Sequence, residues 1–337
     1  MSSSLPVVQP VRALDQFGRT IEYLRISVTD RCNFRCVYCM PEKGMQWLPK
    51  SEILSYEEIT EVVRQLAPLG LRRLRITGGE PTIRPQIHEL IRMLRAIPEI
   101  TDISLSTNGV RLPELARLLR ECGLDRINMS VDSLRPDRIA GIARRDLGFD
   151  PVRSALAAQD AGLEPIKLNM VVMRGVNDHE VVDFAALTLD RRYTVRFIEF
   201  MPPGGEGVEW RSHVVPGREI LQLVSKRYPF DEIKRGELAG PAQDYRIRGA
   251  VGTIGVITPV TGHFCDGCNR IRVTASGMAR GCLFSRKETD LKPLLREEGA
   301  PGLEKALLGV VRFKPEKHRL SEDDPGKCPL RMSRVGG

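Results

Sequence analysis

The sequence predicts an α/β fold, followed by a smaller α+β domain towards the C-terminus. Short β-like runs alternate with longer helix-like stretches through about the first 200 residues. A Pro/Gly-rich break, MPPGGEGV, follows over Met201–Val208, and the strands expected after it are shorter and separated by Gly and Pro. Alternation of strands and helices implies parallel strands joined by right-handed crossovers.

Six strands and five helices account for the first part of the chain. The strands, rich in apolar or β-branched residues, are Leu24–Val28, Leu74–Thr77, Ile103–Thr107, Arg126–Val131, Ile166–Val172 and Val195–Phe200. The helices, with apolar residues three and four apart, are Tyr56–Leu66, Gln86–Leu94, Glu114–Glu121, Val152–Asp160 and His179–Leu189. These units are compatible with a complete or partial α/β barrel or with an open doubly wound sheet, and they are fewer than the eight of a closed barrel.

The remaining elements predict a second domain. Its expected strands and helices are Asp244–Arg248, Gly252–Ile257, Arg270–Ala275, Leu291–Arg296 and Leu303–Val311. The resulting division is a flexible arm over residues 1–20, an α/β domain over 21–205 and a C-terminal domain over 206–337.

Composition indicates a cytoplasmic protein with a basic pocket or a basic surface. The first 20 residues lack the basic start and apolar run of a signal peptide, and no apolar stretch approaches the roughly 18 residues of a membrane span. Eight cysteines without an export signal favour metal binding over disulfides. The net charge of +8 suits a phosphate-bearing partner, whereas 5% aromatic residues are too few for a base-stacking platform.

Three cysteines follow the first predicted strand at C-x3-C-x2-C spacing: Cys32, Cys36 and Cys39. Four thiolates normally hold a [4Fe–4S] cluster, so three leave one iron open to another ligand. The alternatives are a zinc knuckle or three unrelated cysteines. Zinc takes four nitrogen or sulfur ligands, and no His or fourth Cys lies near Cys39 in the sequence. The spacing therefore favours an iron–sulfur cluster.

A second triplet, Cys265, Cys268 and Cys282, has C-x2-C-x13-C spacing. His263 lies two residues before Cys265 and would complete a structural zinc site. From spacing alone, zinc and an iron–sulfur cluster are equally supported.

The first triplet resembles that of the radical S-adenosylmethionine superfamily, and Gly78-Gly79-Glu80-Pro81 resembles the superfamily's GGEP motif. The resemblance implies that S-adenosylmethionine chelates the open iron and that one electron cleaves it to methionine and a 5′-deoxyadenosyl radical. The residues expected to contact this cofactor are Tyr38, Gly79, Ser130 and Met201.

The barrel followed by CxxCNRxRxTxxGxxxxC resembles the GTP cyclase family of molybdenum cofactor biosynthesis, from about Leu24 to the last residue. This implies a partial (β/α)6 TIM-type barrel whose C-terminal domain carries a second [4Fe–4S] cluster, with guanine on its open iron. The implied GTP-binding residues are Arg25, Arg75, Ser106, Lys167, Arg270 and Arg272. Ser106 replaces the family's usual threonine, and Arg73 stands where relatives often have lysine.

The resemblance also implies the reaction of a lyase. The radical takes hydrogen from ribose C3′ of GTP, and C3′ attacks C8 to give (8S)-3′,8-cyclo-7,8-dihydroguanosine 5′-triphosphate. Arg270 or Arg272 is expected to supply charge or a proton, and Gly336-Gly337 to reach the active site. The implied partners are an unidentified electron donor, a downstream cyclic pyranopterin monophosphate synthase and a second copy of the chain, without membrane or nucleic acid.

Two alternative hypotheses for the function remain. One is a two-cluster radical enzyme that modifies a peptide, against which stand the N-R-x-R string and the terminal Gly-Gly. The other is a zinc-stabilised basic RNA-binding module. Cys122 and Cys328 have no cysteine partners at ligand spacing and are expected to be bystanders.

Overall fold

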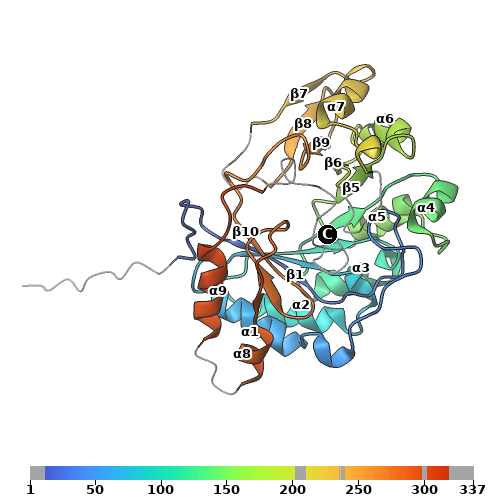
Figure 1. Ribbon diagram of the computed structural model, residues 1–337. Coiled ribbons are helices and arrows are strands. Elements are labelled where there is room, and N and C mark those ends of the chain that lie inside the picture. Colours follow the sequence, from blue (N-terminus) through green and yellow to red (C-terminus); the bar gives the residue numbers. More distant parts are fainter. Residues whose placement is uncertain (1–11, 202–209, 235, 237–239, 298–301, 319–337) are drawn as a thin grey trace, which may run out of the picture.

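The computed structural model describes residues 12–201, 210–234, 236, 240–297 and 302–318 (Figure 1). Within them, one twelve-stranded sheet has the order β12-β11-β10-β1-β2-β3-β4-β5-β6-β9-β8-β7. Strands β1 to β6 follow chain order and pair in parallel with their neighbours. The predicted α/β fold with a partial barrel is confirmed.

The predicted strands and helices of the first part are present, with shifts of a few residues at their ends. The strands are β1 (Tyr23–Ser27), β2 (Arg73–Thr77), β3 (Asp102–Thr107), β4 (Arg126–Ser130), β5 (Lys167–Val172) and β6 (Thr194–Glu199). The helices are α1 (Tyr56–Leu66), α2 (Ile87–Arg95), α3 (Leu112–Glu121), α5 (Pro151–Asp160) and α6 (Val181–Ala186). The sequence did not predict α4 (Pro136–Ala143). Ser55 and Glu58 form the reciprocal capping box at the start of α1.

Strands from the C-terminal part extend this sheet at both edges. Strand β10 (Arg270–Val273) pairs in parallel with β1, and β9 (Thr253–Ile257) pairs in parallel with β6. The antiparallel outer strands are β11 (Met278–Arg280), β12 (Thr289–Asp290), β8 (Gln243–Ile247) and β7 (Phe230–Glu232). The other helices of this part are α7 (Gly217–Ser225), α8 (Lys292–Arg296) and α9 (Leu303–Arg312). Among the described residues, the segment expected as a second domain thus shares its sheet with the barrel.

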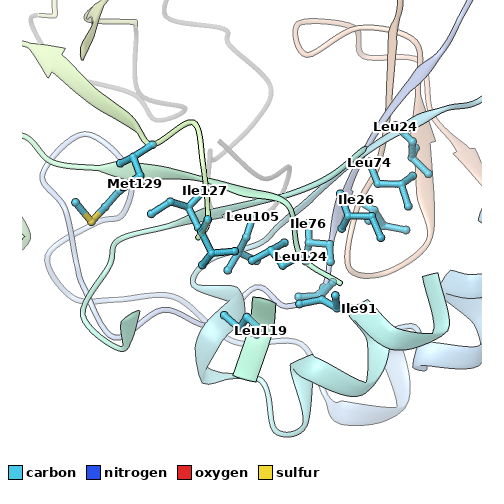
Figure 2. Close-up of a cluster of buried hydrophobic side chains, with 14 of the residues drawn as sticks. Leu24, Ile26, Leu74, Ile76, Ile91, Leu105, Leu119, Leu124, Ile127 and Met129 are labelled. Atoms are coloured by element: carbon cyan, nitrogen blue, oxygen red, sulfur yellow. The ribbon is translucent and has the colours of Figure 1, made fainter. Parts of the chain in front are cut away.

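The two faces of the central sheet differ in polarity. Leu24, Ile26, Leu74 and Ile76 are fully buried, and Figure 2 shows Ile76 close to Ile91 of α2. The alternate positions of the same strands carry Arg25, Arg75 and other polar residues. Because successive strand residues point to opposite faces, the apolar set packs under the helices and the polar set lines the other face. The core therefore fixes which residues line the concave face.

Residues 12–20 belong to the segment predicted as a flexible arm, yet they are packed against the body of the protein. Ala13 donates a hydrogen bond to the carbonyl of Leu69, and Leu14 pairs with Thr20 in an isolated bridge. Arg19 is buried and forms an ion pair with Asp15 at 2.6 Å. Residues 1–11 lie outside the described residues. No helix among the described residues is long and apolar enough to span a bilayer.

Candidate functional site

The loop after β1 presents Cys32, Cys36 and Cys39, all half-buried and none in a disulfide. The N–H of Cys39 donates to the carbonyl of Cys36 at 2.9 Å, and the N–H of Phe34 donates to Sγ of Cys32 at 3.4 Å. The Arg35 guanidinium donates to the carbonyl of Cys32 at 2.6 Å. These hydrogen bonds fold the loop that carries the three thiols into a compact turn.

The chemistry of this donor set fits an iron–sulfur cluster. Burial, with Glu80 as the next cause, raises the pKa of Cys32 to about 12, and burial with Asp132 raises the pKa of Cys36. Thiols of this kind become ligands only when a strongly bound metal displaces their protons. Among the described residues no histidine or carboxylate joins these thiols at single-ion distance. Three thiols without a fourth ligand suit a cluster with one open iron better than a closed zinc site.

The Gly78-Gly79-Glu80-Pro81 segment after β2 packs directly on the cysteine loop. The N–H of Gly79 donates to the carbonyl of Thr29 at 2.7 Å, and the N–H of Glu80 donates to that of Arg31 at 2.8 Å. A Cβ on Gly79 would lie 2.1 Å from the carbonyl oxygen of Arg31. The glycine is therefore required by the approach of the two backbone segments themselves.

The buried Glu80 carboxylate joins two loops. It accepts hydrogen bonds from the N–H of Thr82 at 3.0 Å, from the Thr107 hydroxyl at 2.7 Å and from the N–H of Asn108 at 2.6 Å. The Asn108 amide in turn donates to Asn33, beside Cys32, at 2.7 Å. Glu80 is a positioning residue that ties the loops after β2 and β3 to the cysteine loop.

The four residues expected to contact S-adenosylmethionine lie at one edge of the sheet. Gly79 follows β2, Ser130 ends β4 and Met201 follows β6, while Tyr38 lies in the loop after β1. Carboxyl ends of parallel strands meet at the same edge, so the four residues lie at the end of the barrel where chemistry is expected. The Tyr38 hydroxyl donates to Asp132 at 2.6 Å, and burial raises the pKa of Asp132 to about 6. Asp132 was not singled out in the sequence.

Three predicted GTP-binding arginines stand side by side across the sheet. Arg25 on β1 is in register with Arg272 on β10 and with Arg75 on β2. Arg25 and Arg272 are only 9% and 8% exposed. Burial followed by the neighbouring guanidinium groups lowers the pKa of Arg25, and burial with Arg270 lowers that of Arg272 to about 10. We call Arg272, Arg25 and Arg75 the arginine row.

Further cations adjoin the arginine row. Burial, followed by Arg196, Arg126 and Arg75, lowers the pKa of Lys167 to about 6. Both amide atoms of Asn128, whose residue pairs with Lys167 and with Ser106, are buried without a hydrogen-bond partner. The same holds for Nε of Arg75 and Nε of Arg196. Buried polar atoms are nearly always satisfied in folded proteins, so this face is suited to a polar, anionic ligand.

Arg196 and Asn128 were not among the site residues predicted from the sequence. Arg196 alternates with the apolar Val195 and Phe197 on β6, and Asn128 lies between Ile127 and Met129 on β4. A polar residue between buried apolar neighbours in a parallel strand is the signal that would have found both.

The second triplet lies at the other end of the same strands. Cys268 precedes the start of β10, whose first residue is in register with Tyr23 at the start of β1, whereas the first triplet follows the end of β1. Cys282 follows β11, which runs antiparallel to β10 and returns to that end. The two triplets therefore lie at opposite ends of the β10–β1 pair, with the arginine row between them.

The electrostatics differ at the second triplet. Burial alone would raise the pKa of Cys268, but Arg270 and Lys314 together lower it to about 6. Nζ of Lys314 donates to Sγ of Cys268 at 3.3 Å, to the carbonyl of Arg270 at 3.0 Å and to that of Gly281 at 2.6 Å. Three thiols with a buried cation against one of them form a donor set that fits a second metal cluster. Lys314 was missed because it is 46 residues from Cys268 and only the fold brings it there.

The remaining predicted residues are dispersed. Cys122 is buried in the core, where Arg92 donates to its sulfur at 3.2 Å. The Arg73 guanidinium stacks on the Tyr23 ring at 5.2 Å from its centroid. Gly336, Gly337 and Cys328 lie outside the described residues.

Comparisons with known proteins agree with this geometry. Residues 26–188 match the Radical SAM superfamily, and residues 193–320 match the Molybdenum Cofactor Synthesis C family. The chain is 49% identical over 326 residues to GTP 3′,8-cyclase of Geobacter sulfurreducens, covering 96% of this chain and 99% of that one. It is 45% identical over 328 residues to GTP 3′,8-cyclase of Pelotomaculum thermopropionicum, covering 96% and 99%.

Solved structures share the fold at low sequence identity. Streptococcus suis SuiB bound to S-adenosylmethionine matches with a TM-score of 0.56 and 13% identity, covering 88% of this chain and 69% of that one. Native anSMEcpe with bound AdoMet matches with a TM-score of 0.53 and 15% identity, covering 85% and 84%. Both likenesses concern the fold alone.

The cysteine loop and the match of residues 26–188 to the Radical SAM superfamily define a radical S-adenosylmethionine enzyme, which uses S-adenosylmethionine and an iron–sulfur cluster. Within that class, identity over nearly the whole chain decides the particular family. The chain belongs to the GTP 3′,8-cyclase family of molybdenum cofactor biosynthesis.

Replacing Gly79 tests the packing of the cysteine loop. Gly79→Ala should push the Arg31 backbone away, at a cost of roughly 1–3 kcal/mol, and disturb the loop that presents the thiols. We expect less iron per chain after anaerobic purification and a lower unfolding midpoint. Gly141→Ala is the matched control, because a Cβ there meets no atom within 4 Å. Full iron content and an unchanged midpoint in Gly79→Ala would contradict the assignment.

Proposed function

We propose that this chain converts GTP to (8S)-3′,8-cyclo-7,8-dihydroguanosine 5′-triphosphate, the first step of molybdenum cofactor biosynthesis. The observation that carries the proposal is the arginine row, which lies between two cysteine triplets at opposite ends of the same strands. A triphosphate is the group that a buried set of cations is suited to bind. Membership of the GTP 3′,8-cyclase family agrees with this substrate.

The GTP pocket is proposed to comprise six residues: Arg25, Arg75, Ser106, Lys167, Arg270 and Arg272. Arginine forks match phosphate oxygens in pairs, and the arginine row presents three neighbouring forks. The half-buried Ser106 supplies a hydroxyl that can donate or accept. Binding an anion here offsets the repulsion between the buried cations, so the ligand stabilises the concave face as well as being held by it.

S-adenosylmethionine is proposed to lie at the opposite edge of the pocket, contacted by Tyr38, Gly79, Ser130 and Met201. One cluster would be held by Cys32, Cys36 and Cys39, and a second by Cys265, Cys268 and Cys282. Bound there, these clusters supply one-electron chemistry and an open iron for an exogenous ligand. The order of these residues along the strands supports a binding position for GTP between the two triplets.

The residues of the chain act mainly by position. Holding the ribose and the cofactor in fixed orientation lowers the entropy cost of bringing the reacting atoms together. The sheet and its side chains also keep water away from reactive intermediates. Arg270 and Arg272 lie beside the second triplet and are proposed to supply positive charge or a proton when the cyclised nucleotide is reduced. Gly336-Gly337 is proposed to reach the substrate.

The proposed cellular setting is the cytoplasm, with a homodimer, an unidentified electron donor and a downstream cyclic pyranopterin monophosphate synthase. Neither membrane nor nucleic acid is a proposed partner.

Product analysis tests the reaction. The anaerobically reconstituted chain, given GTP deuterated at C3′, S-adenosylmethionine and dithionite, should place deuterium in 5′-deoxyadenosine. NMR should show a new bond between C3′ and C8 of the nucleotide. Arg270→Gln and Arg272→Gln should lower the yield of reduced product. Deuterium that stays on the nucleotide, with no new bond, would overturn the proposal.

The pH dependence of GTP binding tests the role of Lys167. With a pKa of about 6 the free lysine is mostly neutral at pH 7.5, and a nearby triphosphate raises its pKa, so binding takes up a proton. Affinity should therefore fall as the pH rises above about 6, until the pH passes the raised pKa. Calorimetry in two buffers of different ionisation enthalpy measures this uptake.

Lys167→Arg is the matched control, since arginine stays charged without the ligand. Proton uptake on GTP binding should disappear in Lys167→Arg while binding persists. Equal uptake in both proteins would show that another group titrates.

An extension of the chain tests the proposed role of the terminal glycines. Appending a few residues after Gly337 should abolish turnover if the terminal glycines contact the substrate. Iron content should remain unchanged, which separates this effect from loss of the clusters. Unimpaired turnover would remove the role.

A further inference from the structure

Two histidines flank Cys265 at the second triplet. His263 precedes it in the same loop, and His318 comes from the segment after α9. One ligand atom from each of His263, Cys265 and His318 lies within 4.8 Å of the other two. The two imidazole rings have centroids 5.0 Å apart. Among the described residues, these three have ligand atoms close enough together to bind a single ion, whereas the thiols of each cysteine triplet are not.

A buried arginine fixes this arrangement. Arg19 donates to the carbonyl of Cys265 at 2.9 Å, to that of Glu316 at 2.9 Å and to that of Pro315 at 2.7 Å. Asp15 holds the guanidinium in place. The segment bearing His318 is thus bound to the loop bearing Cys265 by three hydrogen bonds from one side chain.

The cysteines of the triplet have different surroundings. Cys268 accepts from Lys314 at 3.3 Å and lies 3.6 Å from the Arg270 guanidinium, so a single cation next to it would be repelled. Cys265 instead faces two imidazole rings, whose nitrogens are good ligands for divalent transition metals. Of these two cysteines, Cys265 is therefore the one whose surroundings suit a ligand of a single metal ion.

We propose that His263, Cys265 and His318 form a binding site for one zinc-class divalent metal ion in the chain that lacks a second cluster. Imidazole nitrogen and thiolate sulfur are both ligands of tetrahedral Zn²⁺, and three protein ligands leave the fourth position to solvent. Metal–ligand bonds of about 2.0–2.3 Å require ligand atoms roughly 3.5 Å apart. His263 is exposed, so rotation of its side chain can close the remaining distance.

The site overlaps the proposed second cluster through Cys265 alone. It goes beyond the proposed function. Because both would use Cys265, the ion binds only where the second cluster is absent, and its test therefore uses the metal-free chain. Failure of the cyclase assay and failure of metal binding are therefore separate results.

Cobalt titration tests the site directly. The full chain carrying Cys32→Ser, Cys36→Ser and Cys39→Ser, freed of metal by chelation without oxygen, is titrated with Co²⁺ as the probe. One equivalent should give the intense visible absorption of tetrahedral Co²⁺ with a thiolate charge-transfer band, and one equivalent of Zn²⁺ should remove both. Cys265→Ser and His318→Ala should lose the tetrahedral bands.

Two further variants make the outcome decisive. Cys268→Ser should keep the tetrahedral bands, and so should His179→Ala, a remote histidine that serves as control. His318→Cys should bind Co²⁺ with a stronger charge-transfer band from the second thiolate, which guards against a folding defect in His318→Ala. Loss of the bands in Cys268→Ser, with bands unchanged in His318→Ala, would place the ion on the cysteine triplet and overturn the proposal.

Discussion

The burial of like charges in register is the constraint on which the rest of the structure depends. Parallel pairing places Arg272, Arg25 and Arg75 side by side on neighbouring strands, with Lys167 and Arg196 on the same face. Like charges at adjacent strand positions are unfavourable, and burying them adds a desolvation cost. An anionic ligand removes both penalties. The concave face is therefore suited to bind an anionic ligand.

Apolar residues on the outer face of the same strands offset the free-energy cost of burying these cations. Leu24, Ile26, Leu74 and Ile76 alternate with the cations and are fully buried beneath the helices (Figure 2). Each buried aliphatic side chain contributes roughly 1.5–3 kcal/mol. Because a one-residue slip would exchange the two faces, the apolar core also fixes the register that aligns the arginines. The stability of the sheet and the binding of an anion thus depend on the same alternation of apolar and cationic residues along the strands.

The sequence predicted much of the barrel because its strands are local and strongly patterned. All six strands of the first part lie where β-branched and apolar runs placed them, and both cysteine triplets were visible from spacing. Helix α4 was missed, since it has only eight residues and its PDRIAGIA sequence contains a Pro and a Gly, which are signals of turns. The pairing of β10 with β1 and of β9 with β6 joins distant segments, which no local pattern encodes. For the same reason Lys314, His318 and Arg19 were found only in the structure.

Calorimetry with paired ligands measures whether the cations of this face bind the triphosphate of GTP. GTP and guanosine share the base and ribose and differ only in the phosphates that the arginine row is proposed to contact. We expect GTP to bind at least tenfold more tightly than guanosine, which corresponds to about 1.4 kcal/mol. We also expect this advantage to shrink as salt is added. Equal affinity for the two ligands would contradict the proposed contact between the arginine row and the triphosphate.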